Sequence, residues 1–224
     1  LLSSIAVTWS LLNLPETESI QISRQPSITF LDKDGRIIAS YGDVYGQSIQ
    51  FSDLPDNLIN AVIVTEDKSF FSHPGIDFKG VVRAAYTNIK KGRIVQGGST
   101  ITQQLAKNLF LTPERSFTRK LHELILSFWL EMRFSKEQIL SIYLNRVYLG
   151  SGTYGVQAAS EKYFNKKVED LSLYESAVIA SLLKAPSRYN PIANFELSKK
   201  RASLVLNNMA KNNMISLKQV NKAK

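Results

Sequence analysis

Two carboxylates, Glu66 and Glu123, flank a segment that is rich in glycine, amides and cations. Glu66 stands beside Asp67 at the end of an apolar helical pattern, and Phe70 and Phe71 follow shortly after. A carboxylate that is partly desolvated by aromatic neighbours has a raised pKa and can serve as a general base. Because adjacent acids are not separable by sequence, Asp67 stays the alternative base at this point.

Between the two acids, residues 97–108 read GGSTITQQLAKN. A glycine pair followed by Ser or Thr indicates a loop that ends in a helix N-cap. The helix that follows is predicted to bury one apolar stripe, formed by Ile101, Leu105 and Leu109. Gln103 and Lys107 share another face at i, i+4, and we expect this polar face to be free to hold a ligand.

Two cations, Arg119 and Lys120, lie one turn before the second carboxylate, Glu123. The simplest interpretation is an intrahelical ion pair at i, i+4 and i, i+3, worth roughly 0.2–0.5 kcal/mol per pair. Cations held near a leaving group that gains negative charge would also stabilise a transition state. The spacing alone is compatible with both roles.

These segments resemble, in this order, the motifs of the peptidoglycan glycosyltransferase (transglycosylase) family, glycosyltransferase family 51. The resemblance continues through two further motifs, which carry Lys136, Ile139, Tyr143 and Asn145, and then Arg201. It covers roughly residues 54–209. The chain is most similar to the N-terminal catalytic domain of class A penicillin-binding proteins or to a monofunctional enzyme of the family.

The resemblance implies that the chain polymerises lipid II into glycan strands, with inversion at the anomeric carbon and release of undecaprenyl pyrophosphate. It assigns Glu66 as general base and places Glu123 in the cleft, where it would position cations, a divalent ion or the leaving phosphate. Lys107 and Arg115 would grip the donor pyrophosphate. The remaining expected substrate-binding residues are Ser99, Gln103, Gln104, Asn108, Arg119, Lys120 and Phe70. Tyr143, Asn145 and Arg201 are expected mainly to support packing.

The resemblance also implies partners and location. The partners would be lipid II, the growing glycan chain and membrane lipids, with cell-wall synthesis proteins and a C-terminal transpeptidase domain left open. We expect no nucleic acid partner and no organic cofactor, whereas a divalent cation (Mg or Mn) near Glu123 stays open. The catalytic domain would lie on the extracytoplasmic (periplasmic) face of the cytoplasmic membrane, and the antibiotic moenomycin would target it.

Composition agrees with a globular protein that meets an anionic partner. The 224 residues include 28 Lys and Arg against 19 Asp and Glu, a formal net charge of +9, and 44% of residues are hydrophobic. This charge favours anionic lipid, nucleic acid or a phosphorylated substrate without choosing among them. The absence of cysteine excludes a disulfide framework and a cysteine metal site.

The elements that must position these residues are mostly helices, so we predict a mainly α fold. Helical patterns start after Asp53, at Thr100 and at Ser116, the last as a central core helix, and three capping boxes begin at Ser135, Ser172 and Ser216. Strands at 28–31 and 36–39 flank an Asp-Gly turn and predict a small β-hairpin. The resemblance adds a lysozyme-like fold with two lobes and a groove between them.

The predicted organisation is an uncharged segment at 1–14, a linker with the hairpin at 15–52, and the glycosyltransferase domain at 53–224. The first segment is shorter than the roughly 20 residues that span a membrane. We interpret it as the end of a membrane anchor, with a buried or signal-type helix as the alternative. Residues 78–93 mix apolar side chains and cations, which fits an interfacial flap or an ordinary amphipathic surface helix.

Other functions explain the same residues less completely. A muramidase would need an acid with a raised pKa but not the cations around the second acid, and a non-catalytic basic membrane-binding module would not explain the Gly-Gly-Ser-Thr segment. Residues 150–155 match a dinucleotide fingerprint but lack its βαβ frame. Residues 32–35 lack the final Glu of a calcium loop. His73 and His122 lack zinc-site spacing, and we expect His73 to form a hydrogen bond within its own turn.

Overall fold

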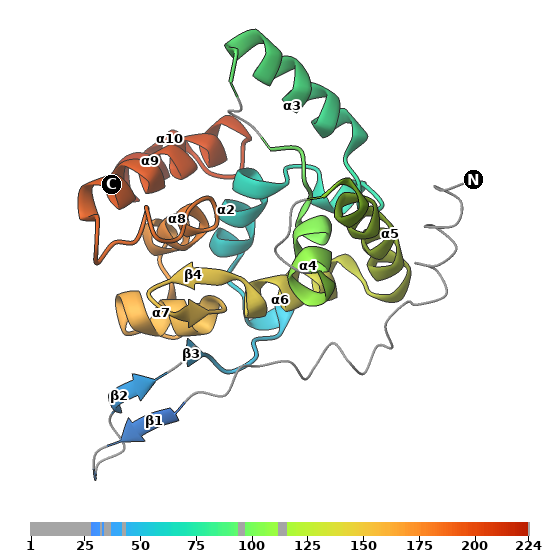
Figure 1. Cartoon of the computed structure of the whole chain (residues 1–224). Coiled ribbons are helices and arrows are strands. Elements are labelled where there is room, and N and C mark those ends of the chain that lie inside the picture. Colours follow the sequence, from blue (N-terminus) through green and yellow to red (C-terminus); the bar gives the residue numbers. More distant parts are fainter. Residues whose placement is uncertain are drawn as a thin grey trace. The chain divides into compact units, whose positions relative to one another are not determined.

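A computed structural model of the chain describes residues 28–31, 33, 37–41, 44–93, 97–111 and 116–223. These residues are mostly helical (Figure 1), which confirms the predicted mainly α class. They divide into two compact units, one built from residues 69–143 and the other from the described parts of 24–68 and 144–224. We call them the α4–α5 unit and the α2–α8 unit. The predicted anchor at 1–14 lies outside the described residues.

The α4–α5 unit contains α3 (Phe78–Lys91), α4 (Ile101–Phe110), α5 (Phe117–Arg133) and most of α6 (Lys136–Arg146), preceded by the 3-10 turn η3 (Phe70–Ser72). Helix α4 packs against α5. The predicted caps are present, since the side chains of Thr100 and Ser116 accept hydrogen bonds from backbone N–H groups in the first turns of α4 and α5.

Helix α5 was predicted to be a central core helix, but only part of its apolar surface is buried. Two of its large apolar side chains are exposed, Phe128 at 39% and Met132 at 75%. The residues that α5 buries are Glu123, Leu126, Ser127, Trp129 and Leu130. The apolar residues of α5 run around most of the helix, so periodicity did not determine which side α4 covers.

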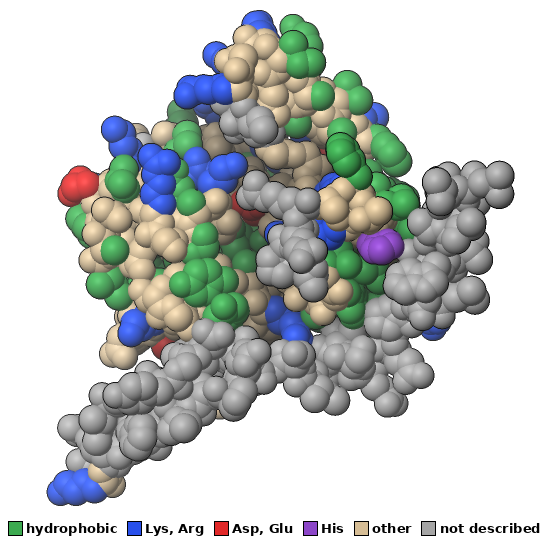
Figure 2. All heavy atoms as spheres, in the orientation of Figure 1, with side chains coloured by type: hydrophobic (Ala, Val, Ile, Leu, Met, Phe, Trp, Pro, Cys, Tyr) green, Lys and Arg blue, Asp and Glu red, His purple; other side chains and the backbone are tan. Residues whose placement is uncertain are grey.

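Helix α3 is amphipathic and buries only Gly80 and Ala84. Its exposed apolar side chains stand beside cations (Figure 2), and they are Phe78, Val81, Val82, Tyr86 and Ile89. The N-cap is Asp77, whose carboxylate accepts from the Gly80 N–H at 2.8 Å and from the Ser69 hydroxyl at 2.6 Å. The Ser69 hydrogen bond is the main reason that the pKa of Asp77 lies below its ordinary value.

The α2–α8 unit is a helical bundle in which α8 (Leu173–Leu182) packs against α2 (Asp56–Glu66) and α9 (Phe195–Lys211). Residues 176–182 of α8 are all buried, so this helix lies at the centre of the unit. Helices α7 (Val156–Phe164) and α10 (Leu217–Ala223) complete it, with the 3-10 turns η2 (Phe51–Asp53) and η4 (Val168–Asp170). The capping boxes predicted at Ser172 and Ser216 both form.

Two small sheets belong to the same unit. Strands β1 (Ile28–Leu31) and β2 (Ile37–Tyr41) pair antiparallel, which confirms the predicted hairpin. The second sheet has the order β3–β5–β4, from Val44–Tyr45, Thr153–Tyr154 and Tyr148–Gly150, with β3 parallel to β5. This sheet was not predicted, because its strands are too short to show periodicity and β3 pairs with a distant part of the chain.

The glycines at 150–155 form the β4–β5 hairpin. Gly155 has a φ of +83°, and a Cβ there would lie 2.7 Å from the carbonyl oxygen of Asn145. Gly152, with a φ of +73°, has open space around it. The motif that matches a dinucleotide fingerprint therefore forms a tight turn next to a helix end.

Among the described residues, no helix is long and apolar enough to span a membrane.

Candidate active site

The buried carboxylate of Glu123 is the centre of a polar cluster in the α4–α5 unit. Glu123 is 3% exposed, and its carboxylate forms ion pairs with both preceding cations. The guanidinium group of Arg119 lies 3.3 Å from one carboxylate oxygen, and the ammonium group of Lys120 lies closer to the other. The predicted intrahelical ion pairs are therefore confirmed. Because the carboxylate is buried, removing one partner would destabilise the protein more than it would for the surface pairs on which the spacing rule is based.

Lys120 links this cluster to the start of α4. Its ammonium group donates to the Ser99 hydroxyl at 3.0 Å and to Gln103 Oε1 at 3.4 Å. One cation thus joins a residue before α4, a residue in its first turn and the carboxylate on α5. The side chain of Lys120 is still 41% exposed, so it can bind an anion without leaving the protein surface. The Nε of Arg119 is buried and has no hydrogen-bond partner in the part of the chain that the structure describes.

The entry to α4 is held by reciprocal capping. The Thr100 hydroxyl accepts from the Gln103 N–H at 3.1 Å, and Gln103 Oε1 accepts from the Thr100 N–H at 3.3 Å. Thr100 also donates to the carbonyl oxygen of Gly75 at 2.6 Å. This capping box fixes the backbone around Ser99 and the side chain of Gln103.

The polar face of α4 is only partly free, which corrects the prediction from sequence. Gln103 is 2% exposed, and its side chain is already used by the capping box and Lys120. Lys107 and Asn108 are exposed. Gln104 Oε1 accepts from the hydroxyl of Tyr143 at 3.0 Å. Lys107 and Asn108 are therefore the residues of this helix that are most available to an anionic or sugar ligand.

Phe70 and His73 shape the loop before α3. Phe70 is fully buried, and the centre of its ring lies 5.2 Å from the centre of the Phe71 ring and 6.2 Å from that of the His73 ring. His73 Nδ1 accepts from the Gly75 N–H at 3.2 Å, which confirms the predicted hydrogen bond within the turn. Because the ring of Phe70 has no exposed surface, it would act on a substrate through its neighbours, and its role in substrate binding stays a prediction.

Glu66 is the last residue of α2, as predicted, and belongs to the α2–α8 unit. It is half-buried, whereas Asp67, the helix C-cap, is 6% exposed. A base must reach a proton on its substrate. Of the two adjacent acids, Glu66 is the more accessible, and we retain it as the candidate base.

The residues of the last two motifs make packing contacts. Asn145 pairs with the backbone of Ile49 through both its amide atoms, at 2.7 and 2.8 Å, and Arg201 lies over the ring of Tyr189 at 5.5 Å. Together with Tyr143, which is 1% exposed, they support the packing role predicted for these motifs. Arg115, predicted to bind the diphosphate, lies outside the described residues.

The described residues do not form a metal site by themselves. No group of three or more His, Cys, Asp or Glu side chains comes together in that part of the chain. Glu123, the predicted metal neighbour, already accepts from two cations.

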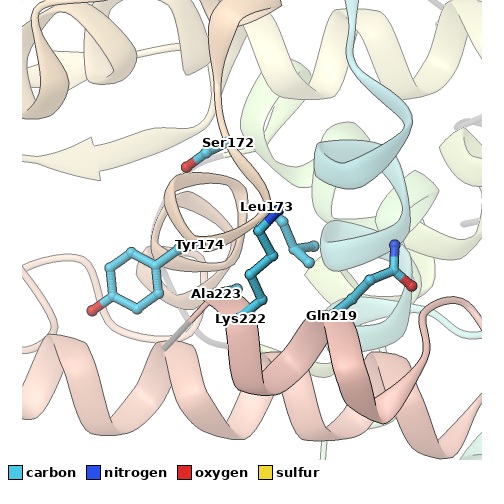
Figure 3. Close-up of a pocket in the computed structure, with 6 residues that line it drawn as sticks. All are labelled: Ser172, Leu173, Tyr174, Gln219, Lys222 and Ala223. Carbon is cyan, nitrogen blue, oxygen red and sulfur yellow. The ribbon is translucent and has the colours of Figure 1, made fainter.

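A cavity of about 330 Å³ lies in the α2–α8 unit, where the start of α8 meets α10 (Figure 3). It is lined by Ser172, Leu173, Tyr174, Gln219, Lys222 and Ala223. None of the predicted site residues lines it, and it holds no acid and a single cation. This lining offers neither a base nor a cluster of cations, so the cavity is not a candidate site for sugar transfer.

One buried polar group was not predicted from the sequence. Glu131 on α5 accepts from Thr102 of α4 at 2.5 Å and from Lys136 of α6 at 2.7 Å. The three residues come from separate helices, so no spacing rule connects them. The only available signal was an acid in an otherwise apolar stretch of α5.

Comparison with known proteins identifies the family of the chain. The sequence profile of the transglycosylase family matches residues 34–210. The chain is 44% identical over 224 residues to penicillin-binding protein 1A of Neisseria gonorrhoeae, covering 99% of this chain and 28% of the relative. It is 43% identical over 200 residues to penicillin-binding protein 1A of Pseudomonas aeruginosa, covering 89% and 24%. The chain thus spans less than a third of these relatives.

A solved structure with a similar fold supports the same family. The crystal structure of penicillin-binding protein 1A from Haemophilus influenzae matches with a TM-score of 0.54 and 25% identity, covering 90% of this chain and 20% of the other. This neighbour supports the predicted lysozyme-like fold. With a profile match over most of the chain and relatives above 40% identity, the chain belongs to the transglycosylase family.

Proposed function

We propose that this chain is a peptidoglycan glycosyltransferase domain that polymerises lipid II. The proposal is supported by membership of the transglycosylase family. The observation that carries it is the buried Glu123, which pairs with Arg119 and Lys120, the latter bonded to Ser99 and Gln103. A hydrolase acting on neutral glycan has no use for this arrangement, whereas a transferase that expels a diphosphate does.

In the proposed reaction, the 4-hydroxyl of the acceptor sugar attacks the anomeric carbon of the donor. Glu66 accepts the hydroxyl proton as the new glycosidic bond forms, and the bond to the polyprenyl diphosphate breaks with inversion. The diphosphate leaves with its electron pair and gains negative charge. Cations that meet this charge in the transition state lower the barrier.

The cations are assigned different parts of this task. Lys107 is exposed and unconstrained by the capping box, so it would bind the donor diphosphate directly. Glu123 orients Lys120 and Arg119 through its ion pairs. These two cations would then interact with the diphosphate mainly as it gains negative charge in the transition state. Arg115 joins this set on the basis of the family motif. Ser99, Gln104 and Asn108 would hydrogen-bond sugar or phosphate oxygens.

We further propose that the domain works at the outer face of the cytoplasmic membrane. The exposed apolar and basic side chains of α3 suit an interface with anionic lipid. A divalent cation would arrive with the diphosphate, because the described residues lack a ligand cluster for it. A transpeptidase domain and cell-wall synthesis proteins are the further partners that this assignment suggests.

The test is incubation of the purified chain with lipid II, with and without magnesium. We expect longer glycan strands together with free undecaprenyl pyrophosphate, and inhibition by moenomycin. Cleavage of preformed glycan without strand growth would instead identify a muramidase. Binding to anionic vesicles without either reaction would identify a non-catalytic membrane module.

A further inference from the structure

Glu131 joins three helices and a turn of the α4–α5 unit. Its Oε1 accepts from the Thr102 hydroxyl at 2.5 Å and from the Lys136 ammonium at 2.7 Å. The same ammonium lies 4.5 Å from the centre of the Phe70 ring. Thr102 belongs to α4, Lys136 to α6 and Phe70 to η3. One carboxylate oxygen of α5 therefore bonds directly to α4 and α6, and through Lys136 it is linked to η3.

Burying this network costs desolvation free energy. Thr102 and Phe70 are fully buried, and the side chains of Glu131 and Lys136 are 10% and 17% exposed. Taking an ion pair out of water costs about as much as its attraction returns, so an apolar set of similar volume would be equally stable. Directional contacts of this kind are best attested where they fix the register between packed elements.

The elements that Glu131 fixes are the ones that carry the polar cluster. Thr102 precedes Gln103 directly, and Glu131 lies two turns after Glu123 on α5. Lys120 reaches Ser99 and Gln103 from α5 at 3.0 and 3.4 Å. Hydrogen bonds weaken steeply beyond such distances, so a slide of α4 along α5 by about 1 Å would break both.

The loop before α3 also packs against Glu131. A Cβ on Gly75 would lie 3.1 Å from Cγ of Glu131 and 3.2 Å from the carbonyl oxygen of Ser127. The carbonyl oxygen of Gly75 accepts from Thr100, the N-cap of α4. The loop thus rests on α5 at Glu131 and is bonded to the start of α4, so it shares the register that Glu131 sets.

We infer that Glu131 is a positioning residue: with Thr102 and Lys136 it sets the register of α4 on α5, which keeps Lys120 and Glu123 aligned with Ser99 and Gln103. As far as turnover is concerned, this inference rests on the proposed function. Glu131 itself need not touch the substrate. Its effect is exerted through the groups on α4 and α5, whose misplacement by about 1 Å can cost on the order of 100-fold in rate.

The test compares two variants that differ in the bond at Thr102 with one that changes the charge of Glu131. Thr102→Val removes the hydroxyl donor while keeping the shape, and Thr102→Ser keeps the donor. We expect kcat/KM for lipid II polymerisation to fall by about 10–100-fold in Thr102→Val and to stay near the wild-type value in Thr102→Ser. Glu131→Gln keeps an oxygen acceptor but loses the charge, and it should fall in between. Because Thr102 and Glu131 belong to one network, the two changes should not be independent, and Thr102→Val with Glu131→Gln should lose less in rate than the product of the two single losses.

Amide hydrogen exchange of α4 is a second readout that does not depend on activity. In Thr102→Val we expect faster exchange across 101–105, with exchange in α8 of the other unit unchanged, because only the anchoring of α4 is lost. If the wild-type chain does not polymerise lipid II, the proposed function fails while this local exchange still tests Glu131. The inference is overturned if folded Thr102→Val keeps both wild-type turnover and wild-type exchange in α4, or if rate losses of the two single variants multiply.

Discussion

Replacing Glu123 by Gln separates the two roles that the sequence left open for this residue. Gln keeps the shape and an oxygen acceptor but removes the charge that pairs with Arg119 and Lys120. If Glu123 only closes an intrahelical ion pair, the variant should lose stability and keep its turnover. If it also orients cations for the diphosphate, turnover should fall in molecules that are still folded.

The expected loss of stability follows from the burial of each partner. Glu123 is 3% exposed, and breaking a fully buried ion pair costs about 3–5 kcal/mol. The side chain of Lys120 is 41% exposed, so its share is reduced to the few tenths of a kcal/mol of a surface pair. Arg119, at 20% exposed, lies between these limits. We therefore expect a loss of about 1–2 kcal/mol, or a melting temperature lower by roughly 2–8 °C for a chain of this size.

The assay combines thermal unfolding with lipid II polymerisation well below the melting temperature. Glu169→Gln, on the exposed turn η4, is the control and should change stability by less than about 0.5 kcal/mol. We expect Glu123→Gln to lose about 100-fold in turnover, as for removal of one group that orients transition-state charge. Wild-type turnover in this variant would reduce Glu123 to a structural ion pair. A wild-type melting temperature would refute the burial argument.

Three further predictions concern other parts of the chain. Lys107→Ala should weaken binding of lipid II and moenomycin by about 10–100-fold in a titration, because a charge-assisted hydrogen bond is lost, whereas Lys162→Ala on α7 should not; an unaltered affinity in the first variant would contradict the diphosphate role. The hydrogen bonds that lower the pKa of Asp77 contribute stability that is fully present above its unfolded pKa of about 3.9 and is lost as pH falls through the lower folded pKa. The protection of amides at the start of α3, measured relative to their intrinsic exchange rates, should therefore fall below about pH 4, and Asp77→Asn should remove this pH dependence. Gly155→Ala should destabilise the α2–α8 unit by about 1–3 kcal/mol in urea unfolding, and Gly152→Ala should cost clearly less; equal costs would show that the contact at position 155 is relieved.

Features decided within a few residues could be predicted from the sequence. The capping boxes at Thr100 and Ser172 form because both partners lie within one turn. The end of α2 at Glu66 and the hairpin of β1 and β2 follow from similarly local signals. The ion pairs of Glu123 also follow from spacing on a single helix.

Features decided by tertiary packing could not be predicted. The burial of Gln103 depends on Lys120 from another helix, so the polar face of α4 was wrongly expected to be open. The exposure of Met132 on α5, which was predicted to be a core helix, is likewise decided by packing against other helices. Glu131 draws its partners from two other helices, and Asn145 meets the backbone of Ile49 far away in the sequence. Such contacts leave no periodic pattern in a single sequence.

The central claim is that Glu66 removes the acceptor proton, and the rate of lipid II polymerisation by Glu66→Gln tests it most directly. A general base contributes about 10²–10⁴ in rate, so we expect a loss of that size while moenomycin still binds with wild-type affinity. Bound inhibitor would show that the cation cluster is intact and that only proton transfer is lost. A polymerisation rate equal to that of the wild-type chain would remove Glu66 from the mechanism.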